Sequence, residues 1–407
     1  MLEFVKVTLR APFRGAKGYW LWLAFLLAWV IVGSVFWGLQ LSHGLRVTHM
    51  TDEVSWGAYI ANFTFLVGIA AAAVLPLIPA YLYRDESVGE VLVFGELMAI
   101  AAVAMCFLFL LVDLGRPERL WHLLPLVGVF NWPSSLLCWD VLAVGGYFLL
   151  NLYLVTRLLY RRFRGREAST GAGVDGKHKP SFLIYLTIVW AISIHTVTAF
   201  LYSGLGGRPY WNAAIVAPHF IASAFASGTA MMIVTLGLLE SRMKLPTPSA
   251  ARGRLRQIAA VSMWINLFLF VSELFSTLYA GTGHAQALRY RLFGLNGHFA
   301  LVPYTWVGIA LEVFGTVVLV VPALYRRLPV LVSGCAAAVI GVWIEKGMGL
   351  VVPGFVPTPL GETIDYSPAL AEFFISAGIW AGGALLFTLM VKAAAPVQLG
   401  QLRSAKA

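Results

Sequence analysis

Long apolar stretches alternate with short polar ones along almost the whole chain. A helix of roughly 20 apolar residues crosses the hydrocarbon core of a bilayer, about 30 Å thick. Ten stretches have this length and predict ten transmembrane helices, near residues 19–40, 54–83, 90–113, 134–157, 182–205, 213–239, 257–280, 301–324, 329–350 and 368–391. Pro76 and Pro79 predict a kink or a tilted end in the second helix. We therefore expect an all-α integral membrane protein with one transmembrane domain over residues 1–407.

The composition supports lipid as the solvent for most side chains. Hydrophobic residues make up 59% of the chain and charged residues 12%, and the mean hydropathy is +0.80. Soluble domains carry about 25% charged residues. The composition therefore excludes a water-soluble globular protein.

A short internal repeat suggests how the helices are grouped. WGAYIANFTF at Trp56 and WNAAIVAPHF at Trp211 share Trp, an Ile four residues later and a Phe nine residues after the Trp. The offset spans four helices, so both copies would have the same orientation in the membrane. We expect two four-helix bundles, helices 2–5 and helices 6–9, with helices 1 and 10 flanking them.

The basic residues predict the orientation. With the N-terminus inside, the cytoplasmic segments hold 22 Lys and Arg and the opposite side holds 7. Cytoplasmic loops of membrane proteins carry such an excess. We expect a multi-pass protein of a bacterial or archaeal cytoplasmic membrane, with both termini cytoplasmic. The most basic stretches, 157–181 and 240–256, then read as cytoplasmic loops and not as nucleic-acid-binding segments.

The cysteines and histidines argue against a resident redox centre. Cys106, Cys138 and Cys335 lie far apart, without the spacing of an iron–sulfur or zinc site. His195 and His219 are the intramembrane histidines, but their depths differ by about 6 Å from helix rise, which disfavours a shared haem. We expect no metal and no covalent cofactor.

Ionisable residues inside the spans are the main functional signal. Each costs about 2.5–3.5 kcal/mol on insertion scales, and most lie toward the non-cytoplasmic side. A quinone headgroup needs hydrogen-bond partners, a proton acceptor and an apolar slot. Candidate quinone-binding residues are Trp56, Tyr59, Asn62, Asp113, Arg116, His122, Trp139 and Asp140. The simpler alternatives are an Asp113–Arg116 pair across a helix end and tryptophans that anchor the membrane interface.

A second set of buried residues suits proton movement. It consists of Glu96, His195, His219, Glu273, Glu312 and Glu345. Glu345 is followed directly by Lys346, and adjacent helical residues project on different sides, so they need not pair.

Several segments resemble the NrfD/PsrC family, the membrane subunits of polysulfide reductase type. They are WGAYIANFTFLVGIAA (56–71), LVDLGRPERLWH (111–122), NWPSSLLCWD (131–140), GRPYWNAAIVAPHFIASAFASG (207–228), GLNGHFALVPYTW (294–306) and LVVPGFVPTPLGETIDYSP (350–368). Ten predicted spans resemble the longer branch, with HmcC and HybB, and above all its DsrP type. One departure is His219, where such sequences more often have Arg.

The resemblance implies a subunit without cofactors that binds menaquinone or ubiquinone as a diffusible ligand. It would exchange electrons with a periplasmic ferredoxin-like iron–sulfur subunit (DsrO-like), within a quinone oxidoreductase complex. A DsrP-like setting implies DsrM-, DsrK- and DsrJ-like partners in dissimilatory sulfur metabolism, as in DsrMKJOP complexes. The alternatives are a proton-translocating subunit and a purely anchoring one.

Overall fold

The computed structural model describes residues 2–72, 74–82, 85–123, 126–165, 182–245, 247–281 and 284–402. The described residues form helices and connecting loops, without a β-strand, and ten of the helices are long and apolar enough to cross a membrane. The ten predicted spans are confirmed. The basic segment 166–181, predicted to be a cytoplasmic loop, lies outside the described residues.

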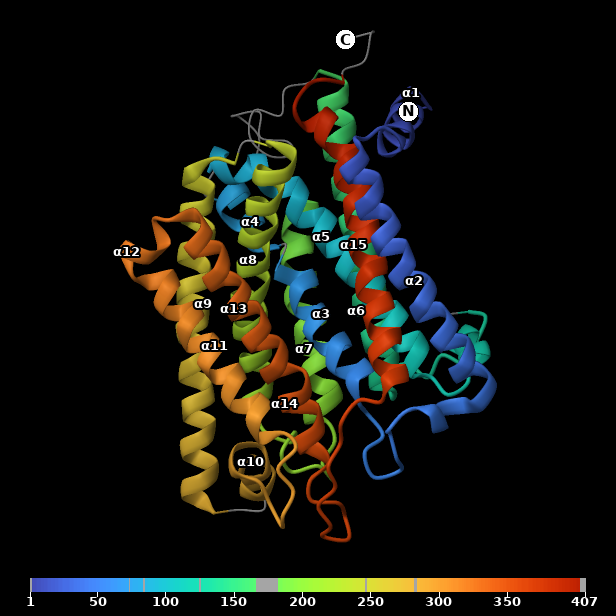
Figure 1. Ribbon diagram of the computed structural model, residues 1–407, viewed down its shortest axis with the longest axis vertical. Coiled ribbons are helices and arrows are strands. Elements are labelled where there is room, and N and C mark those ends of the chain that lie inside the picture. The colour runs from blue at the N-terminus through green and yellow to red at the C-terminus, as the bar shows by residue number, and fades with distance from the viewer. Residues whose placement is uncertain are drawn as a thin grey trace.

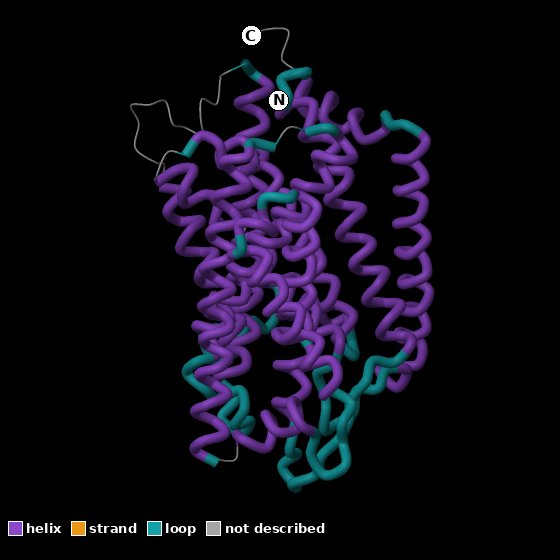
Figure 2. Tube along the Cα trace, turned by 60° about the vertical axis from the view of Figure 1, so that its left-hand side comes forward, coloured by secondary structure: helices purple, strands orange, loops and turns teal. Residues whose placement is uncertain are grey.

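The helices run along the long axis of the molecule, and most loops and turns gather at its two ends (Figures 1 and 2). We call the end with the N-terminal helix the upper end and the opposite end the lower end, as in Figure 1. The spanning helices are α2 (Lys17–His43), α3 (Ala58–Ala72), α5 (Glu86–Asp113), α6 (Leu136–Phe163), α7 (Phe182–Ser203), α8 (Val216–Met243), α9 (Ser249–Ala280), α11 (Val302–Val320), α13 (Leu328–Lys346) and α15 (Leu370–Gln398).

Shorter helices lie at both ends. The upper end has α1 (Leu2–Arg10), and the lower end has α10 (His284–Phe293) and α14 (Met348–Val351). The second span continues beyond α3 through α4 (Val74–Leu77) into a π-helical turn, Ile78–Leu82. This irregular turn lies at Pro76 and Pro79, because each proline lacks an amide hydrogen for the helical ladder.

Two four-helix bundles form the body of the protein, as the repeat predicted. In the first bundle α3 packs on α5 and α7, and α6 closes the ring between them. In the second, α8 packs on α9 and α13, and α11 closes the ring. The bundles meet where α3 contacts α8 and α13, and where α7 contacts α8.

Helices α2 and α15 form a pair beside the first bundle (Figure 1). Helix α3 is almost wholly buried, whereas α2 exposes Trp20, Leu21 and Phe25. The pair is held by a close backbone approach, since a Cβ on Gly33 would lie 2.8 Å from the Cα of Gly378. Small residues allow such approaches between membrane helices, where dispersion replaces the hydrophobic effect as the driving force.

Gly33→Leu is expected to loosen the α2–α15 pair. The added side chain would overlap the backbone of α15, at a cost of about 1–3 kcal/mol, and should lower the melting temperature of the purified protein by several degrees. Gly38→Leu is the matched control, because a Cβ there meets nothing within 4 Å. Equal melting temperatures for the two variants would contradict the contact.

Candidate functional site

An aromatic cluster joins the two bundles at the lower end. Trp56 precedes α3 and stacks on Trp211, which precedes α8, with ring centroids 5.4 Å apart. Tyr202 of α7 meets the two tryptophans edge-on at 5.6 and 5.3 Å. The indole nitrogen of Trp211 donates to the Leu350 carbonyl at 2.8 Å. The two tryptophans equated by the repeat therefore touch at the bundle interface.

The first bundle buries one polar cluster beside the end of α5. The Tyr59 hydroxyl donates to Oε1 of Gln40 at 2.7 Å, and Gln40 Nε2 donates to the Val112 carbonyl at 2.6 Å. Tyr59, Asp113 and Glu372 lie within electrostatic range of one another. Among the described residues no group bonds to the buried Oδ1 of Asp113.

Asp140 presents a second such carboxyl in the same bundle. Its Oδ1 accepts from the Thr198 hydroxyl at 2.7 Å, and its buried Oδ2 has no hydrogen-bond partner within the described chain. Tyr202 lies within electrostatic range of both Asp140 and Asp113. The Tyr202 hydroxyl is 2.5 Å from that of Thr64. Tyr202 thus stands between the two carboxyls and the aromatic cluster.

The other quinone candidates lie elsewhere. The Asn62 Oδ1 accepts from the indoles of Trp343 and Trp380 at 3.0 and 2.8 Å, which ties α3 to α13 and α15. Trp139 is 37% exposed, its ring lies 4.0 Å from that of Trp132 at an angle of 36°, and its indole nitrogen donates to the Pro133 carbonyl at 2.7 Å.

Arg116 and His122 belong to the lower surface. Arg116 is exposed, and the described residues contain no Asp113–Arg116 ion pair. The His122 ring stacks on that of Trp121 at 3.9 Å.

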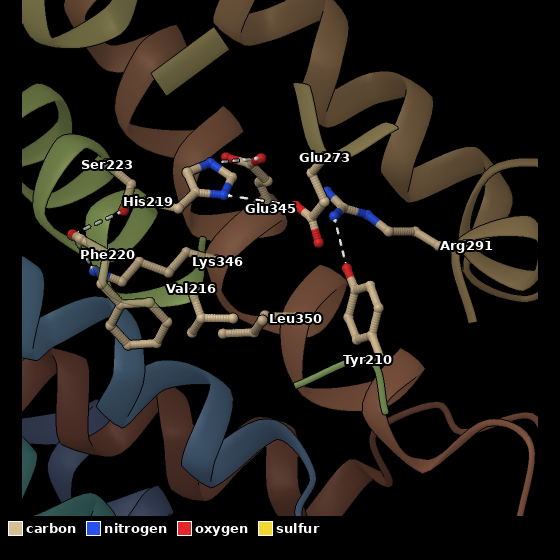
Figure 3. Close-up of a pocket in the computed structure, with 10 residues that line it drawn as sticks. All are labelled: Tyr210, Val216, His219, Phe220, Ser223, Glu273, Arg291, Glu345, Lys346 and Leu350. Atoms are coloured by element: carbon tan, nitrogen blue, oxygen red, sulfur yellow. Dashed lines mark hydrogen bonds and ion pairs between the residues drawn. The ribbon is translucent and has the colours of Figure 1, made fainter. Parts of the chain in front are cut away.

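The second bundle connects four of the six proton-path candidates. His219 Nε2 lies 3.4 Å from Oε1 of Glu345, and His219 Nδ1 lies 3.8 Å from Oε2 of Glu273 (Figure 3). Asn266 Nδ2 is 3.2 Å from both Oε2 of Glu345 and Oε2 of Glu312. One amide thus bridges two carboxyls, so the network reaches from the lower end of α8 to the middle of α11.

The remaining two candidates lie in other places. Both oxygens of Glu96 on α5 are buried without a partner in the described chain, and Tyr147 lies within electrostatic range of them. His195 on α7 packs edge-on against Phe225 of α8 at 6.4 Å, at the interface between the bundles.

A cavity adjoins the network of the second bundle (Figure 3). It is lined by Tyr210, Val216, His219, Phe220, Ser223, Glu273, Arg291, Glu345, Lys346 and Leu350. Its volume of about 30 Å³ suffices for one or two water molecules. It is far smaller than the 300–1,000 Å³, roughly, of pockets that take ligands of quinone size. The cavity suits water and proton movement.

Comparisons with known proteins place the chain among membrane subunits of oxidoreductases. The family model described as "Polysulphide reductase, NrfD" matches residues 46–358. This protein belongs to the NrfD family.

The NrfD-family relatives cover most of the chain. The membrane subunit of a putative dimethyl sulfoxide reductase of Halobacterium salinarum is 27% identical, over 90% of this chain and 88% of the relative. A selenate reductase subunit of Mesobacillus selenatarsenatis is 25% identical, over 92% and 93%. An integral membrane subunit of the Hdr-like menaquinol oxidoreductase of Archaeoglobus fulgidus is 23% identical, over 88% and 89%.

Arg291 of α10 lines the cavity of the second bundle and was not among the residues predicted for the site. It is 3% exposed, and its Nη1 donates to the Tyr210 hydroxyl at 3.3 Å. Burial disfavours the charged form, but Tyr210, Glu345 and Glu273 outweigh it and hold the pKa of Arg291 above its usual value. Burial also raises the pKa of Tyr210 to about 12, so this phenol is neutral.

A charge count could have revealed the buried arginine. The predicted spans 257–280, 301–324 and 329–350 carry three glutamates and one lysine within their apolar runs. Buried charges require compensation, which predicts a further cation from a neighbouring segment. A charge count does not reveal the uncharged residues that hydrogen-bond within these clusters, which are Gln40, Asn266, Thr198 and Tyr202.

Asn62→Ala is expected to act on stability. The change removes the acceptor of two buried indole groups, and an unsatisfied buried donor costs about 1–3 kcal/mol. The melting temperature should fall by several degrees, while quinone affinity stays unchanged. Asn212→Ala is the control, because the Asn212 amide makes an exposed bond to the Ser203 carbonyl. A loss of quinone affinity at unchanged melting temperature would instead assign Asn62 to the ligand.

Proposed function

We propose that this protein is the quinone-interacting membrane subunit of a multi-subunit electron-transfer complex. The observation that carries the proposal is a pair of carboxyls in the first bundle, the half-buried Asp113 and the buried Asp140, each with a buried oxygen that no described residue bonds. Two hydrogen-bonding groups in an apolar bundle are what the two oxygens of a quinone headgroup require. Tyr59 lies within electrostatic range of Asp113, and Tyr202 within range of both carboxyls; Trp56, stacked on Trp211, lies at the lower end.

The chemistry follows from the properties of these groups. Oxidation of a quinol releases two protons and two electrons. Asp113 and Asp140 take the two protons as the O–H bonds break. The electrons leave for a carrier outside this chain, and the reverse sequence reduces a quinone. The ligand in this proposal is menaquinone or ubiquinone.

The partner in this proposal is an iron–sulfur subunit docked on the lower face. The candidate carboxyls lie toward that end, which keeps the electron path short. With 22 of 29 Lys and Arg in the segments expected at the upper end, the upper end is proposed to be cytoplasmic and the lower end periplasmic.

The names of the relatives support a role as a complex subunit. Two are subunits of dimethyl sulfoxide and selenate reductases, and one is a subunit of a menaquinol oxidoreductase. The DsrP-like form of the proposal adds DsrO-, DsrJ-, DsrM- and DsrK-like partners and sulfur metabolism. Co-purification of those partners from native membranes tests that form, and a dimethyl sulfoxide or selenate reductase as the main partner would contradict it.

Asp113→Asn and Asp140→Asn are expected to lower quinol-dependent reduction of the partner's cluster by about tenfold or more, because the amide cannot accept the proton. The rate is measured with the purified complex by the absorbance of the cluster. Glu3→Gln is the control, since Glu3 is exposed in α1 at the upper end, away from the proposed docking face. Wild-type rates for both Asp113→Asn and Asp140→Asn in an assembled complex would refute the site, and a complex without bound quinone would favour a purely anchoring role.

Proton movement through the second bundle is a second candidate function. The observation that favours it is the Asn266 amide, which joins Glu345 to Glu312 and so extends the His219 contacts toward the middle of the membrane.

Glu312→Gln is expected to reduce the number of protons that cross a liposome membrane per electron transferred. Gln retains the hydrogen bonding of Glu312 but cannot carry the proton. A pH-sensitive dye inside the liposomes measures the protons, and Glu53→Gln, a change in an exposed lower loop, is the control. An unchanged ratio of protons to electrons would exclude this route.

A further inference from the structure

Lys346 is a buried cation without a matching ion pair in the described chain. It is 5% exposed, and its Nζ donates to the Phe220 carbonyl at 3.1 Å and lies 4.4 Å from the centre of the Phe220 ring. Glu345, the preceding residue, is engaged by His219 and Asn266 instead. An ammonium group has three hydrogens, and the Phe220 carbonyl accepts one of them. The other hydrogens can reach water in the adjoining cavity.

The ammonium lies where the two bundles meet. Lys346 belongs to α13 and Phe220 to α8, both in the second bundle. On the first-bundle side, a Cβ on Gly68 of α3 would be 3.3 Å from Nζ. His195 of α7 lies within electrostatic range of Lys346. Both His195 ring nitrogens are buried and lack a hydrogen-bond partner within the described residues.

Polar groups continue from this junction into each bundle. Thr198 is on the same face of α7 as His195, because residues three apart are neighbours on a helix, and its hydroxyl donates to Asp140 at 2.7 Å. On the other side, Lys346 lines the water-sized cavity together with Glu345, His219 and Glu273 (Figure 3). Lys346 and His195 therefore separate the candidate quinone carboxyl from the network of the second bundle.

We infer that Lys346, with His195, is the crossing point for protons between the two bundles. A proton that Asp140 takes from quinol passes by way of His195 and Lys346, with water in the cavity, to the Glu345–His219 pair. The electron goes to the iron–sulfur partner, so proton and electron leave the quinol in different directions. The inference rests on the proposed quinone function.

A purely structural lysine does not explain this arrangement. A buried ammonium costs several kcal/mol unless it is paired, and a methionine of similar length would fill the space without that cost. The charged or titratable groups around Lys346 in the described chain are His195 on α7, Tyr210 in the loop before α8, His219 on α8, Glu273 on α9, Arg291 on α10 and Glu345 on its own helix. Each faces the junction or the cavity, so the lysine has proton donors and acceptors on both sides.

The test uses the complete complex in liposomes, with quinol as donor and a pH-sensitive dye. Lys346→Met is expected to slow quinol-dependent cluster reduction by about tenfold or more, to enlarge the solvent deuterium isotope effect, and to leave bound quinone unchanged. Lys346→Arg is expected to remain slow, because a guanidinium keeps the charge but does not release its proton. Lys392→Met is the matched control, a lysine over the Tyr19 ring in another helix.

Wild-type kinetics in Lys346→Met, or full rescue by Lys346→Arg, would overturn the inference. If Lys346→Met does not assemble, His195→Gln decides in its place. Glutamine keeps a polar side chain of similar size but does not titrate, so a slow variant with bound quinone supports the crossing and a fast one refutes it. A wild-type complex that does not oxidise quinol would overturn the proposed function as well, whereas an active wild type with an equally active variant overturns the crossing alone.

Discussion

Charged groups inside a lipid-embedded bundle must find compensation within the protein, because the hydrocarbon offers neither water nor counter-ions. The second bundle meets this constraint with a connected set of groups. Glu273, Glu345 and Glu312 are drawn together by His219 and Asn266, and Arg291 reaches them from a short helix at the lower end. Helix α10 is placed so that Arg291 supplies a cation to these carboxylates, and the side chain of Arg291 lines the cavity beside them.

Neither bundle meets this constraint completely. In the network of the second bundle, Glu312, Asn266 and Arg291 each keep a buried polar atom without a hydrogen-bond partner in the described chain. In the first bundle, Asp113 and Asp140 each have a buried oxygen that no described residue bonds. Unsatisfied buried oxygens are costly, and the quinone proposed above would complete those of Asp113 and Asp140. Glu372 provides the contrast. Its carboxylate accepts from the His49 and Ala369 amides and from Tyr366, so it caps α15 and holds the lower loops. Burial alone therefore does not distinguish a structural acid from a reactive one.

The two bundles consequently have different chemistry on a similar scaffold. The first combines open carboxyls with the aromatic cluster around Trp56, and the second has a polar network beside a water-sized cavity. At their interface, Lys346 of α13 lies within electrostatic range of His195 of α7, and Asn62 of α3 accepts from the indole of Trp343 of α13. In this arrangement a hydrophobic ligand would bind in the first bundle. Protons would move through the second bundle and enter it at the interface.

Sequence alone determined the ten spans, because the length of an apolar run is a local property of the chain. It also indicated the grouping into two bundles, because the motif at Trp56 recurs four helices later at Trp211. It also identified Asp113, Asp140, His219 and Glu345 as buried ionisable groups, since any charge within an apolar run stands out. The partners were decided by tertiary structure. Asn62 meets Trp343 and Trp380 from 281 and 318 residues away, and Arg291 enters the core from a polar helix. Hydrogen bonds depend on ångström-scale packing of distant helices, which hydropathy along a chain does not encode.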